Sequence, residues 1–293
     1  MARSGIPVYS ICNLLGTDRC LTDLLVLNLR SFLAESPDLI FPHRHSFYQI
    51  LFITKGKGKH RIDFETHTVK PMQVHFLAPG QIHNWKFSPD ADGYIINFDG
   101  SFITSVCHNP HFLNEFPFFN SITNRSVLEL KKDAQPQVTN LMNSMMSEFR
   151  GEQDYRNDSL RALLLQLLIT LARHCKPDTK TPAARYNYVL IRNFENLIEQ
   201  NFRSKKLPKE YAALLFITPN HLNALCKSTV GKSAGEMIRD RVLLEAKRLL
   251  ANSAMTIAEV AYYLQFEDNA YFSRFFKKYT GHTPEEFRKM QNT

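Results

Sequence analysis

The spacing of apolar residues changes once along this 293-residue chain, near Pro136, and that change limits what the chain can fold into. From Leu24 to Phe98, short runs of β-branched and aromatic residues alternate with turn signals such as TKGKGK and APGQ, which is typical of closely connected antiparallel strands. After Pro136, apolar residues recur at the spacing of amphipathic helices. We therefore expect two domains: an all-β barrel or sandwich with appended helices, then an all-helical domain.

Two helices are expected directly after the strand region, near 138–150 and 157–175. The second carries a leucine stripe that includes Leu160, Leu164 and Leu167, and a stripe this broad needs burial on more than one side. Two uses of the stripe are open: packing against the chain's own strands, or self-association of two copies. The following residues, 176–184, include two prolines and several polar side chains, which is typical of a linker.

From residue 185 onward the pattern predicts helices joined by short turns. Their expected ranges are 185–201, 208–215, 219–230, 234–252, 257–264, 268–279 and 284–290. Capping residues support several of these ranges because they satisfy backbone groups at helix ends. They are Thr218-Pro219, Thr283-Pro284, the pairs Ser233/Glu236 and Thr256/Glu259, and the glycines Gly231 and Gly281.

The ranges 208–230 and 257–279 each read as a helix-turn-helix, a pair of helices joined by a turn of three or four residues. In each pair the second helix has one polar face: Asn220, Asn223, Ala224 and Lys227 in the first, and Asn269, Ala270, Ser273, Arg274 and Lys277 in the second. The opposite face of the last helix, expected to be buried, holds Phe272, Phe275, Phe276 and Tyr279. Asparagine can pair with adenine and arginine with guanine in the major groove. An ordinary solvated face is the alternative, but two such units favour DNA binding.

The net charge of +8 is concentrated in the helical third, where residues 184–293 hold 17 lysines and arginines against 11 acidic residues. Two readings of this excess are open: a polyanionic partner that binds there, or a solvated basic surface with no partner. The five cysteines are scattered and form no C-x-x-C pair, which argues against a disulfide framework and a thiolate zinc site. No leader segment opens the chain, and no apolar run reaches the about 20 residues that span a bilayer. We expect a cytoplasmic protein with no membrane partner.

Residues 256–289 resemble the second helix-turn-helix of the AraC/XylS family of bacterial transcription regulators. The resemblance rests on Ala258, Ala261, Phe266, the run from Tyr271 to Lys278, Gly281, Thr283-Pro284 and Phe287-Arg288. It implies that 185–293 is the DNA-binding domain and that the middle helix, 234–252, holds the two units apart. It also implies base contacts from Asn220, Asn223, Lys227, Asn269, Ser273 and Arg274, and phosphate contacts from Lys277, Lys232 and Arg239. Gln265 departs from the family pattern, which usually has a glycine that permits positive φ. Ala224 departs too, because relatives often have a larger polar side chain there.

Regulators of this family commonly carry an effector-binding cupin barrel, and PHRHSFYQILFITKGKG and LAPGQIHNW resemble the two cupin motifs. The resemblance implies a cupin-like effector-binding barrel over 1–135 and a dimerisation element over 136–175. Alternate residues share one face of a strand, so we expect His43, His45, Phe47 and Gln49 to point together, with His83 on a neighbouring strand. The histidines at 60, 67, 75, 108 and 111 show no comparable grouping and are treated as ordinary surface or strand-face residues.

Three roles for the grouped histidines are open: hydrogen bonding within the barrel, contact with a polar effector, or a metal site. Metal-dependent cupins add a carboxylate to three histidines, and Gln49 stands at that position here as a weaker ligand for a hard ion. We therefore assign His43, His45, Gln49, His83 and Trp85 to effector contact, with no metal and no cofactor.

We interpret the chain as a sequence-specific transcription regulator and not as an enzyme. Its expected partners are double-stranded DNA, an effector such as a sugar or small acid, and a second copy of itself, with RNA polymerase as a further candidate. One alternative is a cupin-type metal-dependent enzyme with an appended helical domain. Another is a DNA-binding protein whose barrel serves only for dimerisation.

Overall fold

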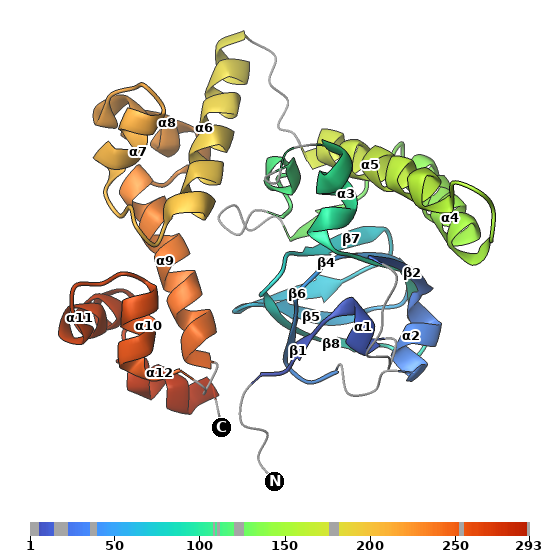
Figure 1. Cartoon of the computed structure of the whole chain (residues 1–293), viewed down its shortest axis with the longest axis horizontal. Coiled ribbons are helices and arrows are strands. Elements are labelled where there is room, and N and C mark those ends of the chain that lie inside the picture. Colours follow the sequence, from blue (N-terminus) through green and yellow to red (C-terminus); the bar gives the residue numbers. More distant parts are fainter. Residues whose placement is uncertain are drawn as a thin grey trace. The chain divides into compact units, whose positions relative to one another are not determined.

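The computed structural model (Figure 1) describes residues 6–14, 23–35, 40–107, 109, 112–119, 126–175, 182–251 and 255–291. The chain divides into two units, Pro7–Pro177 and Asp178–Thr293, which are called the β domain and the helical domain below. In the described part of the chain, no helix is long and apolar enough to cross a membrane.

The β domain contains two five-stranded sheets. In strand order, sheet I consists of β1 (Val8–Tyr9), β3 (His43–His45), β8 (Ile82–Phe87), β5 (Gly58–Ile62) and β6 (Glu65–Val69). Sheet II consists of β10 (Val127–Glu129), β7 (Gln73–Leu77), β4 (Tyr48–Lys55), β9 (Asp92–Phe98) and β2 (Leu24–Asn28). Neighbouring strands pair antiparallel, apart from the parallel pair β1–β3. The predicted all-β barrel or sandwich is confirmed.

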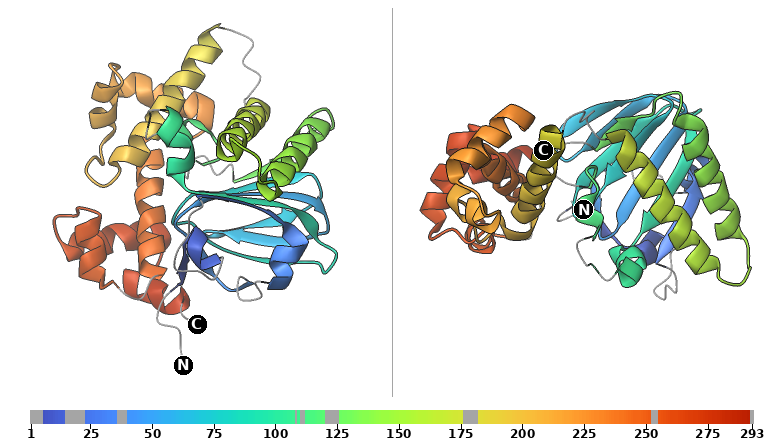
Figure 2. Two further views of the ribbon diagram at one scale, coloured as in Figure 1. Left: turned by 45° about the vertical axis from the view of Figure 1, so that its right-hand side comes forward. Right: turned by 90° about the horizontal axis from the view of Figure 1, so that it is seen from above.

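Sheet II is buried on both faces. Its outer face packs against α4 (Gln135–Arg150) and α5 (Arg156–Cys175), which lie across it in the right-hand view of Figure 2. Its inner face packs against sheet I, where Leu51, Ile95 and Trp85 share one apolar cluster. The leucine stripe of α5 is buried in the outer cluster, so it packs against the chain's own sheet. Among the described residues the domain also has three shorter helices, α1 (Ile11–Leu14), α2 (Leu29–Glu35) and α3 (Gly100–Cys107), and a 3₁₀ turn at Phe112–Glu115.

The helical domain contains two helix pairs separated by one long helix (Figure 1). The helices are α6 (Pro182–Asn201), α7 (Pro208–Leu214), α8 (Pro219–Val230), α9 (Ala234–Ala251), α10 (Ile257–Tyr263), α11 (Asn269–Thr280) and α12 (Pro284–Gln291). All helices predicted in this region are confirmed to within three residues at each end. The helix-turn-helix units are therefore α7–α8 and α10–α11, and α9 connects them.

The predicted capping residues explain why the helix bounds were predicted so closely. The Thr218 hydroxyl accepts from the His221 amide, and Thr256 forms a reciprocal capping box with Glu259. Ser233 with Glu236, and Thr283 with Glu286, make the same two-way contacts. Gly231 and Gly281 end α8 and α11 with φ of 79° and 82°, the left-handed conformation expected of them.

The predicted buried face of α11 is only partly confirmed, because Phe275 is half-buried and Tyr279 is exposed. Tyr279, assigned to the buried face of α11, is 41% exposed, whereas Phe272 and Phe276 are fully buried. Tyr279 lies at the last turn of α11, where its ring packs against Phe275 and beneath the Arg239 guanidinium. The helix therefore buries a narrower apolar stripe than its sequence pattern predicts.

Both helix-turn-helix turns contain a non-glycine residue in the left-handed region. Gln265 has a φ of 54°, at the position where the family usually has glycine. Phe216 occupies the same position in the first turn with a φ of 56°, and its side chain is 95% exposed. The turns are thus built at a conformational cost that glycine would avoid.

Replacing Gln265 with glycine should stabilise the helical domain by about 1 kcal/mol, because the strain of a left-handed residue is about 1–2 kcal/mol and part of it is offset by extra freedom in the unfolded chain. Thermal unfolding followed by circular dichroism measures this. The matched control is Gly281→Ala, which has a φ of 82° and open space around its Cα. It should shift stability by a similar amount in the opposite direction. Equal signs for the two variants would contradict the strain argument.

Candidate functional site

Nine side chains with polar atoms lie buried on strands of the two sheets, and each is at most 6% exposed. Sheet I contributes His43, His45, His60, His83 and Trp85, and sheet II contributes Gln49, Gln73, His75 and Asn97. The antiparallel pairing of β3 with β8 places His43 directly opposite His83. The predicted neighbouring-strand position of His83 is therefore confirmed.

The predicted strand running from His43 to Gln49 is wrong. β3 ends at His45, the chain bends at Ser46 and Phe47, and β4 begins at Tyr48 in the other sheet. Gln49 still faces the interior, because its neighbour Ile50 belongs to the outer cluster of sheet II. Its side-chain amide donates to Asn97 Oδ1 at 2.9 Å. Gln49 and the two histidines therefore approach the same interior from opposite sheets.

His60 and His75 were expected to be ordinary surface or strand-face residues, and this is wrong. Both are fully buried and join one hydrogen-bonded chain. His75 Nε2 lies 3.3 Å from Gln73 Oε1, and its Nδ1 lies 3.1 Å from His60 Nδ1. His60 Nε2 lies 3.1 Å from His83 Nδ1, and His83 Nε2 lies 3.3 Å from His45 Nε2. Two further histidines, at 108 and 111, lie outside the described residues.

A signal for the missed residues was present in the sequence. Gln73 and His75 stand two apart within an otherwise apolar strand, as His43 and His45 do. Polar side chains at that spacing on a buried strand share one face and need partners there. The partner of His75, however, comes from β5, which the local pattern does not identify.

Burial keeps these histidines neutral. It lowers the pKa of His43 to about 4 and that of His75 to about 3, the latter with a further contribution from the nearby charge of His67. Burial also lowers the pKa values of His45, His60 and His83 well below 6.5, and neighbouring histidine charges add to the effect. Near pH 7 each imidazole therefore has one N–H and one lone pair to place.

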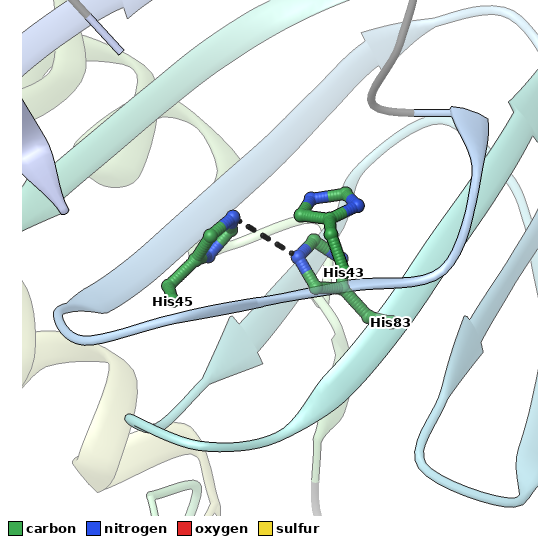
Figure 3. Close-up of side chains that lie close together, drawn as sticks. All are labelled: His43, His45 and His83. Atoms are coloured by element: carbon green, nitrogen blue, oxygen red, sulfur yellow. Dashed lines mark hydrogen bonds between the residues drawn. The ribbon is translucent and has the colours of Figure 1, made fainter. Parts of the chain in front are cut away.

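Several interior atoms have no hydrogen-bond partner among the described residues. They are His43 Nε2, His45 Nδ1, Gln49 Oε1, Trp85 Nε1 and Asn97 Nδ2. Figure 3 shows His43, His45 and His83 with their rings close together, and one ring nitrogen of each lies within 4.8 Å of those of the other two. An unsatisfied buried polar atom costs about 1–3 kcal/mol. A ligand that satisfied these atoms would gain that free energy.

A second candidate site lies on the outward faces of α8 and α11. Asn220 and Lys227 on α8 are exposed, as are Asn269, Arg274 and Lys277 on α11. Ser273 is half-buried. Asp268 caps α11 by accepting from the Tyr271 amide, so its carboxylate is held at the helix start and away from the centre of the polar face.

Three of the predicted DNA contacts have partners within the domain. Asn223 Oδ1 accepts from the Ala234 amide at 3.1 Å, which joins α8 to the start of α9. Lys232 pairs with Asp240 at 2.7 Å, and Arg239 lies 4.3 Å from the Tyr279 ring centre. Asn223 thus has a structural contact through its oxygen, while the other two contacts are at the surface.

Two family models match this chain. The model described as an AraC-like ligand binding domain matches residues 32–174, and the model described as a helix-turn-helix domain matches residues 211–290. Between them the two ranges hold most of the chain. The first contains all nine interior residues, and the second contains the polar faces of α8 and α11.

Curated relatives extend over nearly the whole chain. The HTH-type transcriptional activator RhaR of Mannheimia succiniciproducens is 22% identical over 286 residues, with 92% of this chain and 98% of the relative covered. The arabinose operon regulatory protein of Escherichia coli is 25% identical over 244 residues, with 82% and 80% covered. Among solved structures, ToxT from Vibrio cholerae matches 92% of this chain and 99% of its own, at 12% identity and a TM-score of 0.40.

Proposed function

This chain belongs to the AraC/XylS family of transcription regulators, and from that premise we propose that it binds a small effector between its two sheets and promoter DNA through α8 and α11. The observation that carries the proposal is the pair of exposed, polar recognition faces on one helical domain, joined to a ligand-binding domain with unsatisfied interior atoms. The family consists of regulators and not enzymes, so the enzyme alternative has no support.

The proposed effector contacts are His43, His45, Gln49, His83 and Trp85, and the structure adds His60, His75 and Asn97 as their neighbours. Imidazole and amide groups can bond hydroxyl or carboxyl groups, which suits a sugar or a small acid. One relative is named for an arabinose operon. Trp85 is the single tryptophan of the chain, so its fluorescence can report titration with a library of such compounds.

The proposed DNA contacts divide between the two helices. Asn220, Asn223 and Lys227 would read or position DNA from α8, and Asn269, Ser273 and Arg274 from α11. Lys277, Lys232 and Arg239 are proposed phosphate contacts; for the last two this requires their surface contacts with Asp240 and Tyr279 to open, at a cost of about 0–1 kcal/mol each.

The arrangement of domains is also proposed: 1–135 as the effector-binding barrel, 136–175 as a dimerisation element, 176–184 as a linker and 185–293 as the DNA-binding domain. Two copies would associate through the outward face of α5, where Ile169 is exposed although its leucine stripe is buried. The DNA partner places the regulator in the cytoplasm, where RNA polymerase is the partner through which it would change transcription.

Substitutions on α11 test the DNA-binding proposal. Arg274→Ala should reduce discrimination between the target promoter and a one-base variant by about 1–3 kcal/mol, because a base contact is lost. Lys277→Ala, the matched control, should weaken binding to all sequences alike and flatten the salt dependence by about one unit. Fluorescence anisotropy at several salt concentrations measures both. Unchanged binding of both variants to a genome-selected promoter would reject this recognition surface.

A further inference from the structure

The hydrogen-bond chain in the β domain determines where each interior histidine carries its proton. Gln73 Oε1 already accepts the backbone N–H of Lys70 at 2.9 Å, which fixes it as an oxygen. His75 Nε2 must therefore donate to it, which leaves His75 Nδ1 as an acceptor for His60 Nδ1–H. His60 Nε2 then accepts from His83 Nδ1–H. An imidazole whose proton is on Nδ1 has its lone pair on Nε2, so His83 Nε2 is the free acceptor of this chain.

His43 reaches the same state by a different contact. Its Nδ1 lies 2.8 Å from the carbonyl oxygen of Phe41, which can only accept, so the proton is on Nδ1. His43 Nε2 therefore carries a lone pair, and it has no partner among the described residues. Two buried lone pairs, on His43 and His83, are thus fixed by contacts on the far sides of their rings.

His45 supplies the third nitrogen. Its Nε2 lies 3.3 Å from His83 Nε2, and in the metal-free chain it donates its proton there. Two nitrogens bound to one tetrahedral ion at about 2.0–2.1 Å lie about 3.3 Å apart. An ion between them replaces that shared proton, and His45 then carries its proton on Nδ1.

We propose that His43, His45 and His83 bind a divalent transition-metal ion of the zinc class as part of the effector site. Ligating histidines usually donate their other N–H to a carbonyl or another acceptor; His43 does so to Phe41 and His83 does so to His60. Three imidazoles suit Zn²⁺, Co²⁺, Ni²⁺ or Cu²⁺ and leave one coordination position for an effector or water. Gln49 offers a neutral amide in place of a carboxylate, and its Nε2 donates to Asn97 Oδ1. The lack of a charged oxygen ligand selects against hard ions.

Three further unsatisfied atoms belong to buried residues on the strands of the two sheets. Gln49 Oε1, Asn97 Nδ2 and Trp85 Nε1 offer one acceptor and two donors, all on interior strand faces. A group bound to the ion could hydrogen-bond to them. This regulatory role rests on the proposed function, whereas metal binding itself does not.

Cobalt binding tests the site directly. The untagged full-length chain is stripped with a chelator and titrated with CoCl₂ while visible absorption and Trp85 fluorescence are recorded. We expect one Co²⁺ per chain, the strong visible bands of a four-coordinate ion, displacement by ZnCl₂ and no response to MgCl₂. His83→Gln should abolish the bands. His60→Leu, which removes the acceptor behind His83, should weaken binding about 10–100-fold.

The controls distinguish a variant that has lost the metal site from one that no longer folds. His221→Gln, an exposed histidine on α8, should bind Co²⁺ as the unaltered chain does, and all variants should keep their circular dichroism. Binding that is equal in the unaltered chain and His83→Gln, or absent in the folded unaltered chain, overturns the metal site. Promoter binding is measured in parallel. If it persists without Co²⁺ binding, the proposed function stands alone; if Co²⁺ binds but no promoter does, only the proposed function fails.

Discussion

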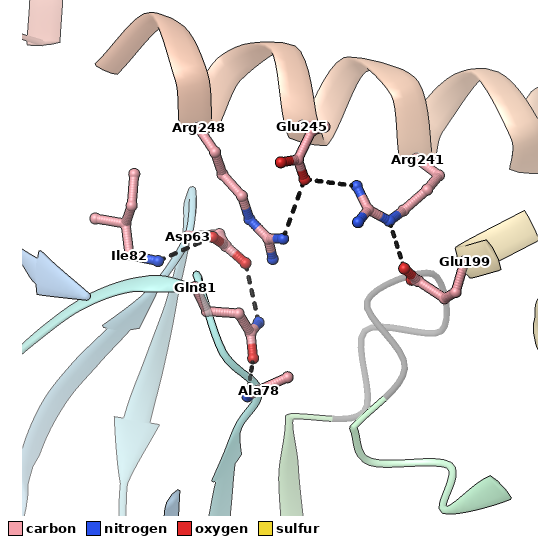
Figure 4. A network of polar contacts seen from close by, with 8 residues as sticks. All are labelled: Asp63, Ala78, Gln81, Ile82, Glu199, Arg241, Glu245 and Arg248. Atoms are coloured by element: carbon pink, nitrogen blue, oxygen red, sulfur yellow. Dashed lines mark hydrogen bonds and ion pairs between the residues drawn. The ribbon is translucent and has the colours of Figure 1, made fainter. Parts of the chain in front are cut away.

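Replacing Arg241 with methionine is expected to lower the free energy of unfolding of the helical domain by about 3–5 kcal/mol. Arg241 lies on α9 with its side chain 8% exposed, and it pairs with Glu199 at 2.8 Å and Glu245 at 2.9 Å (Figure 4). Its guanidinium also lies 3.9 Å from the ring centre of Phe202. Removing it leaves Glu199 without this cation and leaves Glu245 with the longer contact to Arg248, at 3.6 Å. Denaturant unfolding followed by circular dichroism measures the loss.

An exposed ion pair between the turn before α9 and α9 itself provides the matched control. Lys232 and Asp240 lie 2.7 Å apart with side chains 54% and 43% exposed, and such pairs contribute about 0–1 kcal/mol. Lys232→Met should therefore change stability by less than about 1 kcal/mol. Adding Glu199→Gln and Glu245→Gln to Arg241→Met should restore much of the loss, because the unpaired buried charges are then gone. Equal losses for Arg241→Met and Lys232→Met would show that burial does not set the strength of these pairs.

Acidification is expected to destabilise the metal-free β domain, and His75 alone should account for about 2–3 kcal/mol of the loss between pH 7 and pH 4.5. Burial lowers the pKa of His75 to about 3, against 6.5 as its ordinary value. Between these values the unfolded chain binds a proton that the folded chain does not, so unfolding becomes more favourable as the pH falls. The folded state therefore suffers no loss of stability from His75 above pH 6.5, and the loss grows progressively as the pH falls toward 3. Urea unfolding followed by Trp85 fluorescence measures it.

His75→Leu tests this assignment. The variant removes the titrating group, so its stability should fall less between pH 7 and pH 4.5 than that of the unaltered chain, by about 2–3 kcal/mol. The test compares the change in stability with pH and not the stability at pH 7, because the substitution also leaves His60 Nδ1–H without its acceptor. His221→Leu in the helical domain should leave the acid response of Trp85 unchanged. The same pH dependence in His75→Leu and the unaltered chain would contradict the assignment.

The helical domain was largely predictable because its signals are local. Thr218, Thr256 and Gly281 each satisfy backbone groups within four residues of themselves, so their effect can be read along the chain. Tyr279 was mispredicted because its exposure depends on what packs against the end of α11, and spacing along the helix carries no record of that. The positive φ of Phe216 was not predicted, for a related reason. The turn between the two helices holds this residue at positive φ, against the residue's own preference.

The interior of the β domain was predictable only in part. His43 and His45 on one strand, with His83 opposite, follow from alternation and from one pairing of neighbouring strands. His60 and His75 come from β5 and β7, whose positions depend on pairing with β8 and β4. Gln49 was assigned to the correct interior but to the wrong strand, since the bend at Ser46 and Phe47 carries no glycine or proline to signal it.

The sequence by itself determined the family, the helix boundaries and the residue types available for binding, because these follow from residues that stand close together in the chain. Only the tertiary structure decided which histidines meet and where each proton lies. That outcome depends on strand register across two sheets, where a shift of one residue would turn every side chain to the opposite face. The three nitrogens of His43, His45 and His83 converge because β3 and β8 pair in one particular register. The chain of Gln73, His75 and His60 orients His83, and the Phe41 carbonyl orients His43.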